Sequence, residues 1–202
     1  MLRLNPFMLT AVLAVVSFAD NAMAQEEDKD GARFRGGVDA TFGGLFASKD
    51  TLSYTGFTGG VDGHIGVQIN DLVGIYAVPH LAFGKVGLEQ APIELSTGWL
   101  VFAGTAVVDF TIIDQIFVGV GGGGTVHGPT CTNCQALGGG VIHARLGGYP
   151  VIDFGEDGIR RTGLMLGAEL FVSFVSQLSA PSGSDTSLVI LEPMFSIGYE
   201  AF

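Results

Sequence analysis

The sequence contains little charge, little cysteine and no long apolar run beyond its N-terminus. Only 14% of the 202 residues are charged, against roughly a quarter in an ordinary soluble domain. Two cysteines are too few for a disulfide-based scaffold. The chain has nine Lys and Arg against 20 Asp and Glu and no basic cluster, which excludes a basic surface for binding nucleic acid. No later segment approaches the ~20 apolar residues of a spanning helix.

Apolar residues and glycine are abundant instead, and the N-terminus has the three parts of a secretory signal. Arg3 precedes the apolar run Phe7–Phe18, and the small-residue triplet Ala22-Met23-Ala24 follows it. We therefore predict a signal peptide over residues 1–24, with an uncleaved anchor as the alternative. Residues 25–31 form an acidic periplasmic linker, and residues 32–202 form one domain.

That domain alternates apolar and polar residues with a period of two, which predicts β-strands. Phe34, Val38 and Phe42 share one face of the first segment, opposite Arg35 and Asp39. In six of eight such segments a charged residue is present, and it always lies on the non-apolar face. The segments cover residues 33–46, 57–70, 73–83, 100–112, 116–126, 142–152, 164–174 and 189–200.

The strand length, the low charge and the placement of aromatics favour apolar residues facing lipid. The strands exceed the ~5–6 residues usual in soluble sheets, and aromatics gather toward both ends of the apolar band, as in bilayer-crossing barrels. Connections at 70–72 and 113–115 are short, whereas those at 47–56, 85–95, 127–137 and 176–187 are longer. Because hydrocarbon cannot satisfy free backbone groups, the sheet must close. The fold class is all-β, an eight-stranded antiparallel up-and-down transmembrane β-barrel; a soluble periplasmic barrel is the alternative.

With its signal triplet, its eight alternating segments and its aromatic C-terminus, the chain resembles the eight-stranded outer-membrane β-barrels of Gram-negative bacteria, of the OmpA transmembrane-domain type. The resemblance implies location in the outer membrane, with lipid, lipopolysaccharide and the barrel-assembly machinery as partners. It also implies an assembly signal in the last strand, in which Phe202 is out of phase with Phe195, Ile197 and Tyr199. That signal comprises Phe195, Ile197, Tyr199 and Phe202.

The inward face is predicted to hold an ionic cluster in the lumen. Because isolated charges are costly in a low dielectric, we expect Arg35 and Arg145 to pair with carboxylates such as Asp39, Asp62 or Glu169. Three inward arginines face six carboxylates, so some carboxylates must be protonated, hydrated, or neutralised by histidine or a cation. The predicted cluster comprises Arg35, Asp39, Asp62, His64, His143, Arg145, Glu169 and Glu192.

This pattern favours a structural, surface-exposed barrel whose outer loops bind an unidentified ligand, with no catalytic residues and no cofactor. A narrow cation-favouring pore is the alternative, because inward glycines can leave volume, although glycine also serves closely approaching backbones. A lipid A-modifying enzyme is a third hypothesis. The inward glycines are Gly37, Gly43, Gly60, Gly66, Gly119, Gly121, Gly123, Gly147 and Gly167.

Cys131 and Cys134 are predicted to form a local disulfide in an outer loop, because the chain is exported. A thioredoxin-type pair has this spacing but opens a helix, which is not expected here. His127 would make three possible zinc ligands with the two thiols, short of a closed structural site. No metal is therefore expected.

Overall fold

The computed structural model describes residues 32–49, 52–90, 93–113, 115–130, 135–154, 161–178 and 187–201. The predicted signal peptide, the linker over 25–31, Cys131, Cys134 and Phe202 lie outside the described residues. Within the described ranges, no helix is long and apolar enough to cross a membrane.

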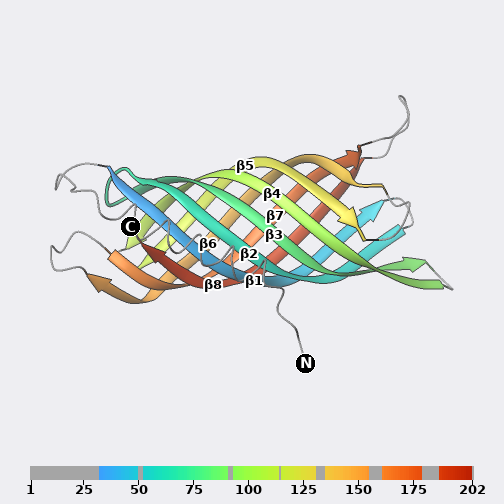
Figure 1. Ribbon diagram of the computed structural model, residues 1–202, viewed down its shortest axis with the longest axis horizontal. Coiled ribbons are helices and arrows are strands. Elements are labelled where there is room, and N and C mark those ends of the chain that lie inside the picture. The colour runs from blue at the N-terminus through green and yellow to red at the C-terminus, as the bar shows by residue number, and fades with distance from the viewer. Residues whose placement is uncertain are drawn as a thin grey trace.

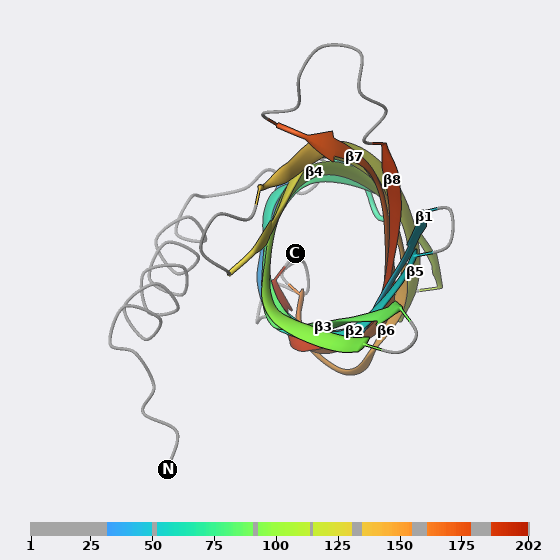
Figure 2. The same cartoon turned by 90° about the vertical axis from the view of Figure 1, so that its right-hand side faces the viewer.

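Eight antiparallel strands form one closed barrel in which each strand pairs with its sequence neighbours and β1 pairs with β8 (Figures 1 and 2). This arrangement confirms the predicted fold class, and each strand is at least 14 residues long. The strands are β1 (Arg33–Lys49), β2 (Leu52–Gln68), β3 (Val73–Gln90), β4 (Ile93–Ile113), β5 (Ile116–Pro129), β6 (Leu137–Phe154), β7 (Arg161–Gln177) and β8 (Leu188–Ala201).

The barrel has an apolar exterior and a buried polar interior, the reverse of a soluble barrel. Large apolar side chains such as Phe57, Phe102 and Leu146 are more than half exposed, whereas Arg35 and Asp109 are buried. Outward apolar and inward polar residues are the pattern of a transmembrane barrel. Phe195, Ile197 and Tyr199 of the predicted assembly signal lie exposed on the outer face of β8.

We call the two ends of the barrel the loop end and the turn end. The loop end joins β1 to β2, β3 to β4, β5 to β6 and β7 to β8; the turn end joins the remaining consecutive pairs. The longer connections predicted at 47–56 and 85–95 of the loop end were wrong, because β1 extends to Lys49, β2 begins at Leu52, β3 extends to Gln90 and β4 begins at Ile93.

At the turn end, Asn70 Oδ1 accepts hydrogen bonds from the backbone N–H of Leu72 at 2.9 Å and Val73 at 2.8 Å. This side-chain turn closes the short β2–β3 connection.

A bulge in β6 breaks the predicted alternation near the turn end. The register with β7 shifts between Gly148 and Val151, and the extra residue reverses which faces follow. Val151 is consequently 62% exposed, while Ile152 packs against the buried ring of Phe117 and the neighbouring Tyr149. Alternation counted from Ile142 predicts that Ile152 lies on the outward apolar face, and the bulge makes that prediction wrong.

The nine inward glycines allow neighbouring groups to approach closely. A Cβ atom at any of the nine would lie less than 3.0 Å from another heavy atom. At Gly43, Gly60, Gly121 and Gly123 the nearest atom is a backbone carbonyl oxygen of the adjacent strand. These glycines therefore serve close strand approach and strong bending. They do not support the volume argument for a pore.

Candidate lumenal site

The lumen is divided into an apolar half and an ionic half. A cluster of buried apolar residues lies toward the loop end and includes Leu45, Trp99, Phe171, Val175 and Ile190. This apolar cluster was not among the predictions from the sequence, which placed only an ionic cluster in the lumen. Alternation assigns its residues to the inward face but does not show that they contact one another.

At the turn end, Arg35 is the centre of a buried ionic network. Its Nε donates to Glu200 Oε1 at 2.9 Å, and its Nη2 donates to Asp109 Oδ2 at 3.0 Å and to the Tyr149 hydroxyl at 3.0 Å. The Tyr149 hydroxyl itself donates to Glu200, and Arg35 Nη1 donates to Gln68 Oε1 at 3.1 Å. One guanidinium thus neutralises two carboxylates that have no access to water.

The predicted partners of Arg35 were wrong. Asp39 lies four residues further along the same strand, about 13 Å away at the rise of a β-strand. Glu200 instead belongs to β8, where it pairs in register with Gly37 of β1. Asp109 comes from β4. Both carboxylates are on the inward face by alternation, but only the barrel closure brings them to Arg35.

Three carboxylate–histidine pairs occupy the middle of the lumen. His64 Nε2 lies 3.2 Å from Asp39 Oδ2, His143 Nε2 lies 2.9 Å from Glu169 Oε2, and His80 contacts Asp62. The ring of Phe171 stacks on His143 at 4.1 Å between centroids and lies 4.5 Å from His80. Residues on five different strands therefore form one packed cluster.

Arg145 is buried beside this cluster without a carboxylate partner. It donates to the Tyr76 hydroxyl at 2.6 Å and to His64 Nε2 at 3.3 Å, and its guanidinium lies 4.5 Å from the ring centroid of Phe117. Glu169 is its direct partner in register, yet no described carboxylate lies within 4.0 Å of its nitrogen atoms. The predicted ion pair of Arg145 was therefore wrong.

The buried lumen has more negative than positive groups. Its six carboxylates face only two buried arginines, an excess of four (6 − 2), because Arg33 bonds at 2.6 Å to Asp71, a residue that is largely exposed. Three imidazoles lie close to three of these carboxylates and offset a negative charge only when they are protonated. Glu192 is buried and its Oε1 has no hydrogen-bond partner. The carboxylates are Asp39, Asp62, Asp109, Glu169, Glu192 and Glu200.

A hydroxyl, an imidazole and a carboxylate also form a continuous series of contacts in this cluster. Thr105 Oγ1 lies 3.1 Å from His143 Nδ1, and the other ring nitrogen contacts Glu169. The three residues are each at most 4% exposed. Because all three residues are buried, we interpret Thr105 and Glu169 as groups that orient the ring of His143.

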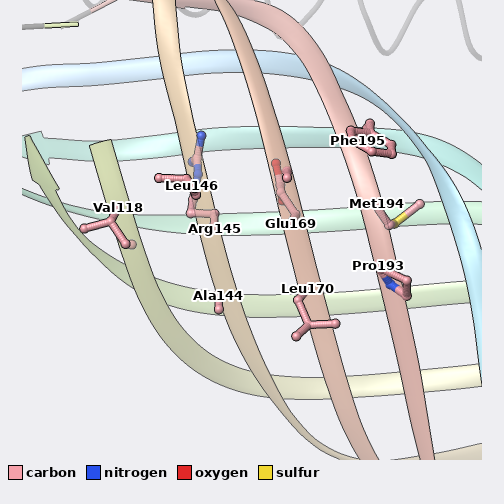
Figure 3. Close-up of a pocket in the computed structure, with 11 residues that line it drawn as sticks. Val118, Ala144, Arg145, Leu146, Glu169, Leu170, Pro193, Met194 and Phe195 are labelled. Carbon is pink, nitrogen blue, oxygen red and sulfur yellow. The ribbon is translucent and has the colours of Figure 1, made fainter. Parts of the chain in front are cut away.

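An open groove of about 450 Å³ lies over β5 to β8. Seven of its eleven lining residues belong to the outward, lipid-facing register, including Val118, Leu170 and Phe195. Figure 3 shows Arg145 and Glu169 side by side on the neighbouring strands that form its floor. The groove is therefore an apolar feature of the membrane face, and its position over the ionic cluster reflects the small outward side chains Ala144 and Ala168.

Comparison with known proteins yields structural matches alone. No protein-family model and no curated protein sequence matches the chain. Among solved structures, it is similar to Ail, the attachment invasion locus protein of Yersinia pestis, with 14% identity over 83% of this chain and 98% of that chain and a TM-score of 0.47. Ail has also been solved in complex with the heparin analogue sucrose octasulfate. The outer membrane protein OprG from Pseudomonas aeruginosa matches with 8% identity, 87% and 99% coverage, and a TM-score of 0.48.

Proposed function

We propose that the protein is an integral outer-membrane barrel that serves as a non-conducting membrane anchor and presents its loop end for binding. The filled lumen is the observation that carries this proposal. The apolar cluster closes the half toward the loop end, and the Arg35 network closes the half toward the turn end. Because an eight-stranded barrel is only wide enough for its own side chains, a water path has no room between these layers.

The exterior supports placement in a lipid bilayer, and the N-terminal signal pattern supports export to the outer membrane. Lipid and lipopolysaccharide would then cover the apolar face. The barrel-assembly machinery would act through the last strand, where Phe195 and Tyr199 are exposed.

In planar bilayers, we expect the purified protein to produce no single-channel steps in potassium chloride, sodium chloride or calcium chloride. Correct insertion is checked separately by heat-modifiable mobility on gels. Discrete, cation-selective steps from inserted protein would contradict the anchor proposal. They would support the alternative of an acidic, cation-favouring pore.

Two of the four loop-end segments favour a ligand that is bound by hydrogen bonds more than by charge, whereas residues 47–56 and 85–95 contain Lys49, Asp50, Lys85, Glu89 and Glu94. Residues 127–137 contain no Asp, Glu, Lys or Arg, and residues 176–187 contain five serines and one charged residue, Asp185. A strongly charged ligand would need opposite charges that these segments lack. We propose a neutral polar surface, such as carbohydrate hydroxyl groups, as the partner class.

Replacing residues 179–186 with a glycine-serine linker should abolish binding of expressing cells to immobilised neutral glycans. Binding by the unmodified protein should change little between low and high salt, because hydrogen bonds are screened less than exposed charges. Replacing residues 155–160 at the opposite end of the barrel is the matched control and should leave binding intact. Equal binding by both variants would contradict a role for this loop.

A further inference from the structure

Buried side-chain atoms without a hydrogen-bond partner occur at several places in the lumen, among them Thr58, Asp109, Ser173 and Glu192. Asp39 differs from these residues because both of its carboxylate oxygens lack a hydrogen-bond partner, and Oε1 of Glu169 also has none. Buried polar groups in native proteins are nearly always satisfied, by protein, water or an ion. The surroundings of Asp39 are therefore a candidate place for a bound guest.

The surroundings of Asp39 indicate that the guest is a cation. Asp39 is the direct register partner of Asp62, so two carboxylates lie opposite each other on the same face, which is an unfavourable pairing. Asp62 contacts His80. Among the described residues, Asp39 has only His64 Nε2 within 4.0 Å as a basic neighbour, and that contact lacks the alignment of a hydrogen bond.

The ring nitrogens of His64 are shared among three charged groups. Nε2 lies 3.2 Å from Asp39 Oδ2 and 3.3 Å from Arg145 Nη1, and Nδ1 lies 3.5 Å from Glu200 Oε1. Because arginine is always a donor, Arg145 competes with Asp39 for the same ring nitrogen. Neither oxygen of Asp39 receives a hydrogen bond in this arrangement.

We propose that Asp39, His64 and Glu169 bind a divalent transition-metal ion of the zinc class inside the barrel. One ligand atom from each residue lies within 4.8 Å of the others, and all three residues are buried. Imidazole with two carboxylates is a donor set that suits zinc and similar ions. Two negative ligands neutralise a divalent ion, which lowers the acidic excess of the lumen from four to two.

The groups behind Glu169 already have the arrangement of a supporting shell. Glu169 Oε2 is held by His143 Nε2, which leaves Oε1 without a partner and available to a metal. His143 Nδ1 contacts Thr105 Oγ1, which fixes the orientation of the ring. Metal-ligating carboxylates commonly carry such hydrogen bonds. The three ligands come from β1, β2 and β7, so no spacing in the sequence reveals them.

The test is metal content after refolding, because the closed lumen limits entry once the barrel has formed. The full chain is unfolded, refolded into detergent micelles with zinc chloride, passed over a desalting column and analysed by mass spectrometry for bound metal. We expect about one zinc per chain. His64→Gln and Glu169→Gln should each lower the zinc content at least tenfold, whereas Glu192→Gln, which alters a buried carboxylate outside the set, should retain it.

Refolding with cobalt chloride gives a second measurement that needs no variant. Bound Co²⁺ with nitrogen and oxygen ligands should show visible d–d absorption that added zinc abolishes in a competing refolding. Absence of metal from the refolded unmodified chain, or equal zinc in all four proteins, would overturn the proposal and leave protons as the only compensation. If the glutamine variants do not fold, the cobalt spectrum decides: zinc-sensitive bands support the site, and their absence overturns it.

Discussion

Replacing Arg35 with methionine is expected to lower the free energy of unfolding of the barrel by about 3–5 kcal/mol, the usual cost of removing one partner from a buried ion pair. Arg35 is 1% exposed and its partners Asp109 and Glu200 are fully buried. Without the guanidinium, two carboxylates remain in a low dielectric, and among the described residues only Glu200 keeps a basic neighbour, His64 Nδ1 at 3.5 Å from its Oε1. Desolvation, and not the lost attraction, therefore accounts for most of the expected effect.

Arg33 provides a matched control two residues away on the same face of β1. Its partner Asp71 is 75% exposed, and exposed ion pairs contribute about 0–1 kcal/mol. Arg33→Met should therefore change stability by less than about 1 kcal/mol. The contrast separates burial from charge, because both substitutions remove one arginine.

Urea titration of the barrel in lipid vesicles, followed by gel mobility, measures both effects. Trp99, the single tryptophan, is buried in the apolar cluster and reports unfolding by fluorescence. Adding Asp109→Asn and Glu200→Gln to Arg35→Met should restore most of the lost stability, since the stranded charges are then removed. Equal losses for the Arg33 and Arg35 variants, or no recovery in the triple variant, would contradict the proposed cause.

The architecture could be predicted because lipid imposes a strict alternation on every strand. Segments such as 34–46 and 164–174 place most of their apolar residues outward, and Arg35 and Glu169 inward, with a period of two, although Leu45 and Phe171 are buried in the lumen. A chain of this kind has one way to satisfy its backbone groups in hydrocarbon, which is closure. Local pattern and global fold are thus linked by the solvent, and the number of strands follows from counting the segments.

The contacts inside the lumen could not be predicted because they depend on strand tilt and register. Arg35 meets Asp109 across 74 residues of sequence and Glu200 across 165. Alternation assigns all three to the interior but gives no height along the barrel axis. The β6 bulge at Gly148 and Val151 is a second example, since one inserted residue reverses the face on which Ile152 lies.

The glycines show the same limit, because the sequence alone does not distinguish a space from a close contact. Gly123 on β5 faces the lumen and Gly104 on β4 faces lipid, but in the sequence both are simply glycines within a β-strand. A Cβ at Gly104 would have no neighbour within 4 Å, whereas a Cβ at Gly123 would overlap the backbone oxygen of Gly104. The two positions are adjacent in the barrel, but only Gly104 has space for an added Cβ atom.

Gly123→Ala is therefore expected to lower the free energy of unfolding by about 3 kcal/mol, at the upper part of the usual cost of overpacking. The overlapping atom is backbone, so β4 and β5 must separate and their shared hydrogen bonds must lengthen. Gly104→Ala adds the same methyl group to the lipid face and should change stability by no more than about 0.5 kcal/mol. The same urea titration compares the two variants. If Gly123→Ala were as stable as Gly104→Ala, β5 would have space beside it, and the case for a filled lumen would lose its steric basis.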